Sequence, residues 1–389
     1  MQFLALAARG TAELVAAECR ALSLKVTKTD AEGVHLDLSW RELAIALVHL
    51  RVAQRILVEL GSHPAFDGDS LYAAARKVDW GEWLDARSTF AVYASGDTMP
   101  PGKTPEGRPH AGLTNLQFVG LRVKDAIADD LTRRLGKRPN VSRDDPVVSV
   151  VVRGRQGRWN FYLDAADPPL FQRGIRIADV EAPLKETLAA ACVDLTGWTG
   201  RGKLIDPMCG SGTLIIEAVS KVLGLAPGCT RTFAIERWPH HGKTLLKWCT
   251  EIRAQAVEKA QKALEGAKLD VAASDIDPAA VRATRENLAN AGLSELVQVS
   301  CRDARELPPQ PPGTVLLSNP PYGQRLSPGE AEPLWRELGQ AWRGKGLWQV
   351  WLIAPNELPE AMGWERRRTS PLNNGSIDVA MQLLVEPSA

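Results

Sequence analysis

Short apolar runs alternate with amphipathic stretches in the second half of the chain, and this alternation constrains its fold more than any other feature. Four runs have the length and composition of buried strands: Lys203–Ile205, Asp270–Ser274, Val297–Cys301 and Thr314–Leu317. Helical patterns follow the first two, at 214–223 and 279–291. Strand-then-helix alternation is typical of a parallel sheet, in which ligands bind at the carboxyl ends of the strands. We therefore expect an α/β domain whose site residues directly follow its strands.

The stretch Asn319-Pro320-Pro321-Tyr322 follows the fourth predicted strand. An Asn side-chain carbonyl and a backbone carbonyl at fixed positions accept the hydrogens of an exocyclic amine on a planar base and aim its lone pair at an electrophile. The two prolines hold the backbone rigid, and Tyr322 is expected to stack on the base. Asn319, Pro320 and Tyr322 are therefore the predicted catalytic residues. The alternative is a strand-to-loop turn, in which Asn and Pro are common.

The turn after the first predicted strand is rich in glycine: Asp206-Pro207-Met208-Cys209-Gly210-Ser211-Gly212-Thr213. Glycines let the backbone approach a ligand closely, and Asp206 at the strand end can accept hydrogen bonds from an ammonium group. The spacing excludes a P-loop and a dinucleotide motif, because the third glycine of the latter is replaced by Ile215. The predicted cofactor residues in this turn are Asp206, Cys209, Gly210, Gly212 and Thr213.

Acidic residues also follow the second and third predicted strands. Asp275 lies where nucleotide-binding α/β folds hold a ribose diol, whereas Asp277 is assigned to capping the helix that Pro278 begins. Asp303 lies where it can bond an adenine amine, and the alternative for it is a turn residue. We add Asp275, Asp303 and Asn319 to the predicted cofactor residues.

The first half is predicted to form two smaller α+β modules. Residues 1–63 have the pattern of strand, helix, strand and helix, at Gln2–Ala8, Thr11–Leu22, Val34–Leu38 and Trp40–Leu60. His63-Pro64 breaks this pattern and marks the predicted boundary. Residues 64–165 then contain a strand, a long helix and a β-hairpin, at Phe90–Ala94, Leu113–Leu135, and Val147–Arg153 with Arg158–Leu163.

A linker rich in Pro, Asp and Arg is predicted at 166–183. The catalytic unit then spans 184–389, and Pro183 opens its first helix, at Leu184–Val193. The stretch from about Gly224 to Leu269 exceeds what this fold needs between its first two strands. It contains a helix at Lys243–Leu264 and is expected to lie beside the cofactor.

Basic residues concentrate between Arg133 and Arg158, although the net charge of the chain is only +1. Because the whole molecule carries no strong field, any nucleic-acid binding must come from such a local cluster. We expect the end of the long helix and the hairpin to converge into a phosphate-binding patch; its residues are Arg133, Arg134, Lys137, Arg138, Arg155 and Arg158. The alternative is a solvated face, the usual role of a charge run.

Several classes of protein are excluded by what the sequence lacks. No signal peptide and no membrane-spanning run is found, which predicts a cytoplasmic protein without membrane contact. The six cysteines are scattered without a C-x-x-C pair, so neither a disulfide framework nor a metal site is predicted. The sequence does not predict an oligomeric state.

Motifs spread over nearly the whole chain resemble one family, the THUMP-domain RNA guanine-N2 methyltransferases. The similar branch is the N-terminal half of the large-subunit ribosomal RNA methyltransferase L, whose members often carry the label N6-adenine-specific DNA methylase. The motifs are Ala7-Ala8-Arg9-Gly10 with Glu13-Leu14, Lys124-Asp125-Ala126-Ile127, Ala182-Pro183-Leu184-Lys185-Glu186, the glycine-rich turn, Phe233-Ala234-Ile235-Glu236-Arg237-Trp238-Pro239, and Asn319-Pro320-Pro321-Tyr322-Gly323.

The resemblance implies three domains: ferredoxin-like (1–63), THUMP (64–165, binding structured RNA) and, after the linker, a Rossmann-like class I methyltransferase domain with a seven-stranded, mostly parallel sheet (184–389). It implies S-adenosylmethionine as cofactor and an N2 of guanosine in 23S ribosomal RNA as the target. Methylation of transfer RNA guanine, an adenine-N6 activity on RNA or DNA, and an RNA-binding assembly factor with a decayed catalytic domain remain alternatives.

One stretch departs from the family pattern. Phe171-Gln172-Arg173-Gly174-Ile175-Arg176 stands where the family has Leu-His-[basic]-Arg-Gly-Tyr-Arg, so the His and the Tyr are absent. Roles for those two side chains are therefore in doubt. Arg173 and Arg176 remain, and we predict that both contact RNA phosphates.

Overall fold

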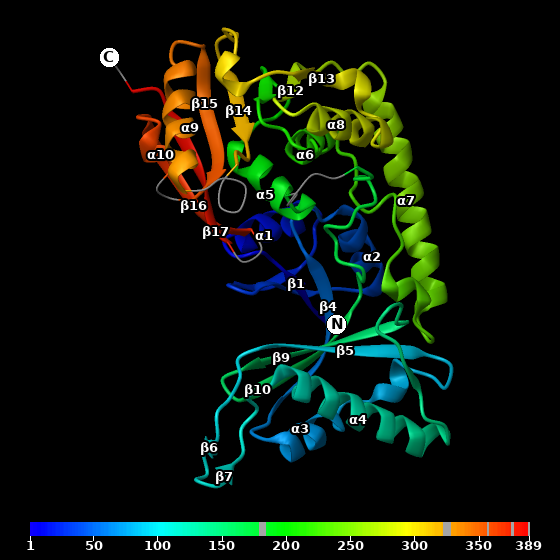
Figure 1. Ribbon diagram of the computed structural model, residues 1–389. Coiled ribbons are helices and arrows are strands. Elements are labelled where there is room, and N and C mark those ends of the chain that lie inside the picture. Colours follow the sequence, from blue (N-terminus) through cyan, green and yellow to red (C-terminus); the bar gives the residue numbers. More distant parts are fainter. Residues whose placement is uncertain (179–183, 322–327, 356–357, 375–376, 388–389) are drawn as a thin grey trace.

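Two β-sheets organise the computed structural model, one in each half of the chain (Figure 1). The structure describes residues 1–178, 184–321, 328–355, 358–374 and 377–387. None of the helices in those ranges has both the length and the apolar character needed to cross a membrane.

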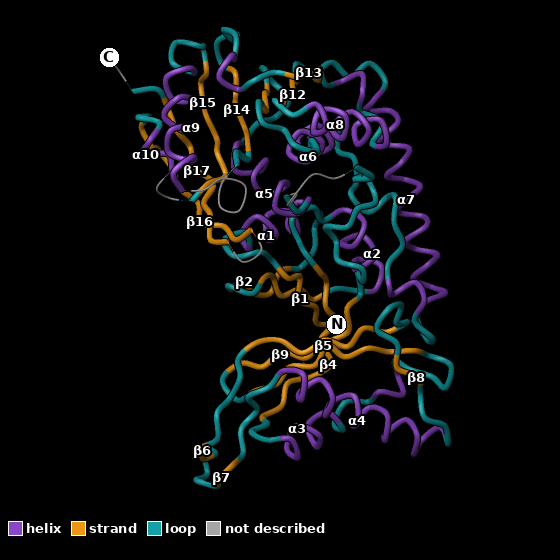
Figure 2. Tube along the Cα trace, in the orientation of Figure 1, coloured by secondary structure: helices purple, strands orange, loops and turns teal. Residues whose placement is uncertain are grey.

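The first half contains an eight-stranded sheet. Its strands, in spatial order, are β2 (Val26–Asp30), β3 (Gly33–Asp37), β1 (Gln2–Leu6), β4 (Arg55–Pro64), β10 (Arg158–Asp164), β9 (Val148–Arg155), β5 (Thr89–Gly96) and β8 (Asn140–Val141). Its helices are α1 (Ala12–Ala21), α2 (Trp40–His49), α3 (Gly68–Ala75) and α4 (Leu116–Leu135), with the short 3-10 helix η1 (Trp80–Glu82). A small hairpin, β6 (Gly102–Lys103) with β7 (Pro109–His110), extends from it as an arm (Figure 2).

Strand β4 corrects the prediction of one helix over Trp40–Leu60. The helix α2 ends at His49, and Arg55–Pro64 is a ten-residue strand. A short apolar run fits helix and strand equally well, and here pairing with β1 decides in favour of the strand. The strand continues through His63 and Pro64 and pairs with β10 as well, so it joins both modules into one sheet.

Strand β2 is absent from the predicted elements, because its residues are mostly polar and show no apolar alternation. The other predicted elements of this half are confirmed with shifts at their ends. The long helix α4 begins at Leu116 and ends with Gly136 in the left-handed conformation. The hairpin of β9 and β10 has the predicted partners, with Arg158 opposite Arg155.

The second half of the chain contains a seven-stranded sheet, which confirms the expected mostly parallel arrangement. Its strands, in spatial order, are β13 (Gln298–Cys301), β12 (Val271–Asp275), β11 (Leu204–Asp206), β14 (Thr314–Ser318), β15 (Leu347–Ala354), β17 (Ile377–Val385) and β16 (Glu365–Asn374). The first five strands run parallel, and β17 and β16 add an antiparallel edge.

Helices cover both faces of this sheet. The helices of this half are α5 (Glu186–Thr196), α6 (Thr213–Val222), α7 (Gly242–Leu264), α8 (Pro278–Asn290), α9 (Pro328–Ala341) and α10 (Leu358–Ala361), with the short η2 (Ala234–Arg237), η3 (Ser294–Leu296) and η4 (Ala304–Glu306); α7 and η2 pack against the first half rather than on the sheet. In β14, Val315 and Leu317 pack into the core that contains α5 and α6, whereas Leu316 packs against α9. Alternate residues thus bury both faces, as a central parallel strand requires. Pro183 lies outside the described residues, and α5 begins at Glu186.

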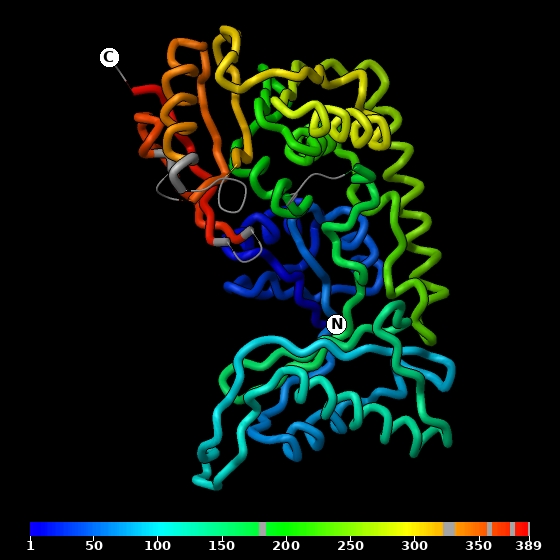
Figure 3. Tube along the Cα trace, in the orientation of Figure 1, coloured from blue at the N-terminus to red at the C-terminus, as the bar shows by residue number. Residues whose placement is uncertain are grey.

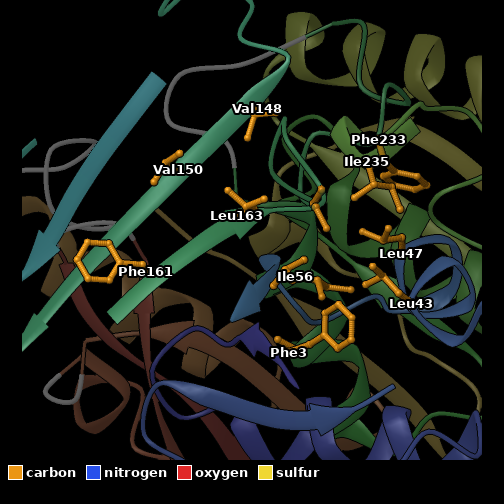
Figure 4. Packing of buried hydrophobic residues seen from close by; sticks show 14 of the residues in the cluster. Phe3, Leu43, Leu47, Ile56, Val148, Val150, Phe161, Leu163, Phe233 and Ile235 are labelled. Carbon is orange, nitrogen blue, oxygen red and sulfur yellow. The ribbon is translucent and has the colours of Figure 1, made fainter. Parts of the chain in front are cut away.

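Most of the surplus segment packs against the first half of the chain, which corrects the expectation that it lies beside the cofactor; only its ends, at Leu225 and Leu264, pack against the core of the seven-stranded sheet. Phe233 and Ile235 pack against Leu43 and Leu47 of α2 (Figure 4). Helix α7 continues along the side of the molecule from the catalytic half to the first half (Figure 3). The segment therefore contacts both halves of the chain and connects them.

Candidate functional site

Three neighbouring strand ends bring predicted cofactor and catalytic residues together. Strand β11 lies between β12 and β14, and all three run parallel. Asp206 ends β11, Asp275 ends β12, and Asn319 directly follows β14. Because the strand order reverses around β11, a crevice is expected at this edge of the sheet. The structure contains one there, with a volume of about 310 Å³.

The crevice combines acidic and apolar walls. Asp275, Asp303 and Asn319 line it, as predicted. Met208 and Gly210 of the glycine-rich turn line it too, together with the exposed side chain of Ile276. Asp206 is only 1% exposed and lies behind this wall.

The glycine-rich turn is held against β12 by backbone hydrogen bonds. Cys209 N donates to Ser274 O at 2.9 Å, and Gly210 N donates to the Asp275 carboxylate at 2.9 Å. Gly212 has φ +81°, and a Cβ there would approach Thr284 Cγ2 to 2.9 Å. The left-handed conformation and the close approach both favour glycine at this position.

Cys209 and Thr213 point into the protein rather than into open space. The Cys209 thiol is 3.4 Å from Thr284 Oγ1, and burial raises its pKa. Thr213 is 9% exposed, with its hydroxyl 3.4 Å from that of Ser211. A high thiol pKa makes Cys209 an inert packing residue, and the cofactor contacts of both side chains stay predictions.

Asp275 has the position expected of a ligand carboxylate, and Asp277 caps a helix. Asp277 accepts a hydrogen bond from Ala279 N at 2.8 Å, which confirms its assignment to capping α8. Asp275 accepts bonds from two backbone amides, Gly210 N and Asp277 N. Its carboxylate is thereby oriented at the edge of the crevice.

Asp303 is fixed by a neighbour that the sequence analysis did not identify. The Arg305 guanidinium donates to both Asp303 oxygens and lowers the pKa of that carboxyl. Arg305 also donates to Glu337 of α9 at 2.7 Å. Asp303 therefore stays ionised and can accept hydrogen bonds. Arg305, only two positions away in the sequence, could have indicated this ion pair.

A buried hydrogen bond connects β14 with β11. The Ser318 hydroxyl donates to Asp206 Oδ1 at 2.6 Å, and both side chains are buried. Burial raises the pKa of Asp206 to about 7, although Ser318 and Met208 N act in the opposite direction. Ser318 directly precedes Asn319, so its position in the motif was a signal that the sequence analysis missed.

Asn319 presents an unused acceptor. Its Oδ1 atom is buried and finds no hydrogen-bond partner among the residues that the structure describes. An unpaired buried carbonyl costs free energy unless a ligand completes it. Pro320 beside it is buried, and Tyr322 lies outside the described residues.

The predicted RNA-binding residues do not converge, which corrects the expectation of a single patch. Lys137 and Arg138 precede Asn140, which pairs with Thr89 at one end of β5. Arg155 and Arg158 flank the β9–β10 turn beside Gly154, which pairs with Gly96 at the other end. The ends of this eight-residue strand are about 23 Å apart. Two separate basic groups result.

Arg133 and Arg134 are engaged by acidic partners. Both bind the buried Asp130, and Arg134 also binds Asp79. Their guanidinium groups stay partly exposed, at 62% and 39% of the side chain. Both remain candidates for a further contact with RNA.

Arg173 corrects the prediction of a phosphate contact. It is 1% exposed, donates to Glu217 at 2.7 Å and also donates to the Arg51 carbonyl. A side chain enclosed in this way cannot reach RNA without unfolding its surroundings. Arg176 pairs with Glu186 at 2.8 Å and is 17% exposed, so it too stabilises the protein interior.

Family models match three consecutive parts of the chain. They are the RlmL ferredoxin-like domain at 2–57, the THUMP domain at 66–164, and the model described as RMKL-like, methyltransferase domain, at 173–382. These matches confirm the two N-terminal domain types and the resemblance found in the sequence. The domain boundaries remain predictions.

Individual relatives are similar along almost the entire chain. Ribosomal RNA large subunit methyltransferase K/L of Psychromonas ingrahamii is 31% identical over 381 residues, which are 96% of this chain and 49% of that protein. The chain thus spans about half the length of that curated relative.

Two solved structures are similar over at least 99% of this chain. SMU.472, complexed with SAH, has a TM-score of 0.84, 27% identity and coverage of 100% of this chain and 98% of that one. A predicted N6-adenine-specific DNA methylase of Listeria monocytogenes has a TM-score of 0.81, 25% identity and coverage of 99% and 96%. Together with the sheet topology, they confirm the class I methyltransferase fold.

Proposed function

The chain belongs to the family described as RMKL-like, methyltransferase domain, and on this premise we propose that it methylates the exocyclic N2 of a guanosine in 23S ribosomal RNA. The observation that carries the proposal is Asn319 Oδ1 at the crevice, which is buried and has no hydrogen-bond partner among the described residues. An exocyclic amine is a donor of the right kind for that atom, and its nitrogen is a poor nucleophile that needs orientation.

The crevice fits S-adenosylmethionine, which supplies the electrophilic methyl group when bound. Its volume of about 310 Å³ lies at the lower end of the range for ligand sites. We assign the ribose diol to Asp275, the adenine amine to Asp303 and the apolar contact with adenine to Ile276. Asp206 lies at the strand end where its negative charge attracts the ammonium group.

The catalytic strand end acts by positioning the amine. Asn319 Oδ1 and the Pro320 carbonyl accept its two hydrogens, which draws the nitrogen toward a tetrahedral geometry and directs its lone pair. Ser318, bonded to Asp206, holds this strand end in register with the cofactor strand. No strong base is required, because the proton can leave after the nitrogen has been alkylated. Tyr322 is proposed to stack on the base once it has left its own stack.

The choice of ribosomal RNA rests on the relative and on the N-terminal domains. The matched protein of Psychromonas ingrahamii is a ribosomal RNA large subunit methyltransferase, and residues 66–164 match the THUMP domain. A domain dedicated to structured RNA fits a large folded substrate. The exposed basic groups at the two ends of β5 would bind its phosphates.

An adenine-N6 activity is the main alternative. The Listeria monocytogenes structure is described as a predicted N6-adenine-specific DNA methylase, and adenine offers the same kind of amine to the same acceptors. Guanosine in transfer RNA and a role as an assembly factor are further alternatives. The assembly-factor role is disfavoured because Asp206, Asp275 and Asn319 are all present in the sequence.

Mass spectrometry of RNA from a deletion strain tests the proposal. Ribosomal RNA should lose one N2-methylguanosine, and the purified protein with S-adenosylmethionine should restore it. Loss of N6-methyladenosine instead would identify adenine as the target base. Loss of N2-methylguanosine from transfer RNA would identify transfer RNA as the substrate. Unchanged nucleosides in both RNA pools, with no cofactor binding in calorimetry, would leave the assembly-factor role.

A further inference from the structure

A hollow of about 690 Å³ lies far from the crevice, at the base of the β6–β7 arm. Three aromatic residues, Phe66, His110 and Trp159, are among the residues that line it. The Phe66 and His110 rings lie 5.5 Å apart between centroids. Trp159 is 1% exposed, and its indole nitrogen donates to Ala65 O. Phe66 and His110 are partly exposed, so their rings offer the accessible aromatic surface, and the buried Trp159 supports it from below.

Two cations stand at the rim of the hollow. Lys103 is exposed on β6, and Arg155 is exposed at the β9–β10 turn. The contact of Arg155 with Glu32 is long, at 3.9 Å, with 59% of the arginine side chain exposed. Such an exposed pair contributes little stability, so Arg155 can exchange Glu32 for another anion.

Polar groups also line the hollow. His110 Nδ1 is buried and finds no hydrogen-bond partner in the part of the chain that the structure describes. Asp97 lines the hollow and is exposed. A ring nitrogen and a carboxylate beside aromatic faces suit the polar edge of a base.

The shape of the hollow depends on glycines at its turns. Gly157 has φ +76°, and a Cβ there would approach Phe66 Cε1 to 3.0 Å. Gly112 has φ +80°, and its Cβ would lie 2.4 Å from Met99 O. A side chain at either position would displace the walls.

We propose that this hollow binds an unstacked nucleotide of single-stranded RNA, separate from the base that is methylated. Aromatic faces that stack on a base and cations that bind its phosphate are the elements of single-strand recognition. In Figure 2 the arm lies at the bottom of the molecule and β14 in its upper part, so the hollow is separate from the crevice. The inference rests on the proposed function only in taking RNA as the partner.

Binding of a fluorescein-labelled oligouridine of about ten nucleotides, within the site size of single-strand binders, tests the hollow on the full chain. In anisotropy titrations Phe66→Ala should weaken binding roughly tenfold or more, the scale of one lost base stack. Phe66→Tyr should bind like the unchanged protein, because it keeps the ring. Lys103→Gln with Arg155→Gln should lower the slope of log affinity against log salt by about one unit or more.

A matched control removes a cation elsewhere. Lys247→Gln changes an exposed residue of α7, 73% exposed, and should leave affinity and salt slope unchanged. Because Phe66 is half-buried, circular dichroism is used to check that Phe66→Ala is folded. The double variant Lys103→Gln with Arg155→Gln changes only exposed residues, so it tests the hollow without disturbing the fold. Unchanged binding in both Phe66→Ala and the double variant would overturn the proposal.

Two further measurements separate this inference from the proposed function. Photo-crosslinking with 4-thiouridine should attach the oligonucleotide to peptides containing Phe66 or His110, and crosslinks confined to other peptides would overturn the hollow. Methyl transfer to ribosomal RNA is assayed in parallel. If the protein methylates normally and neither Phe66→Ala nor the double variant changes oligonucleotide binding, the hollow alone is refuted. Oligonucleotide binding at the hollow without methyl transfer refutes the proposed function alone.

Discussion

The two sheets of this protein arrange their polar residues in opposite ways. In the catalytic sheet, Asp206, Asp275 and Asn319 lie at neighbouring strand ends, and buried or backbone bonds orient the two carboxylates. In the eight-stranded sheet, the basic residues are exposed and lie at both ends of β5. Chemistry at one atom requires a preorganised geometry, whereas attraction to a phosphate backbone requires only accessible charge. Substitutions in the first set should therefore cost far more than substitutions in the second.

The largest effect is expected where the two halves meet. Glu217 of α6 is 2% exposed and pairs with Arg173 and Arg51. Glu217→Ala leaves two buried guanidinium groups without their counter-ion, so unfolding in urea should show a loss of about 3–5 kcal/mol. Glu251→Ala on the exposed surface of α7 should change stability by less than about 0.5 kcal/mol. Equal stability of the two variants would contradict the role of this buried ion pair.

Asn319→Ala should be nearly as costly, but in rate rather than stability. Its acceptor matters most while charge develops on the amine, so turnover should fall on the order of 10²–10³. Cofactor affinity should hardly change. Single-turnover assays at saturating cofactor measure this effect, with Asn140→Ala, an exposed residue of β8, as the control. A near-normal rate for Asn319→Ala would reduce the motif to a structural turn.

The contrast also explains what the sequence could predict. Asp206, Asp275 and Asn319 follow strands directly, and the carboxyl ends of parallel strands meet at one edge, so local spacing was sufficient to place them. The predicted phosphate-binding patch required a helix end and a hairpin to lie side by side. The spacing of Arg134 and Arg155 in the sequence does not determine whether they do. Thr284 illustrates the same limit, since it contacts the glycine-rich turn from α8 without any local motif.

The prediction that Arg173 contacts RNA phosphates was wrong for a related reason. Charge and position in a linker favoured exposure, but the chain buries this residue between α6 and the ferredoxin-like domain, with Glu217 as partner. The helix predicted over Trp40–Leu60 failed because apolar spacing alone does not distinguish a helix from a strand. Both errors concern tertiary packing, which a single sequence specifies only weakly.

A smaller effect is expected from the charge on Asp206. Because its pKa is raised to about 7, lowering the pH protonates it and removes the negative charge that attracts the ammonium group. Calorimetry between about pH 5.5 and about pH 7.5, where an α-amino group stays mostly protonated, should show affinity for S-adenosylmethionine falling as the pH falls. Asp206→Asn should bind about 1–3 kcal/mol more weakly at the upper pH and lose most of this dependence. A variant that keeps the full pH dependence would exclude Asp206 as its source.

The smallest effect should come from neutralising the exposed basic residues. This effect shows which end of β5 binds RNA phosphates. Arg133 and Arg134 are unsuitable for this test, because removing them leaves Asp130 buried and unpaired. Lys137→Gln with Arg138→Gln removes charge at one end, and Arg155→Gln with Arg158→Gln removes it at the other. Each pair that binds phosphates should lower the slope of log RNA affinity against log salt by about two units at most, with cofactor affinity unchanged.

If the hollow beside Arg155 binds a nucleotide, the second pair should have the larger effect on binding of a short oligonucleotide. The first pair should then matter only for long folded RNA. Equal, unaltered slopes for both pairs would return all four residues to an ordinary solvated surface.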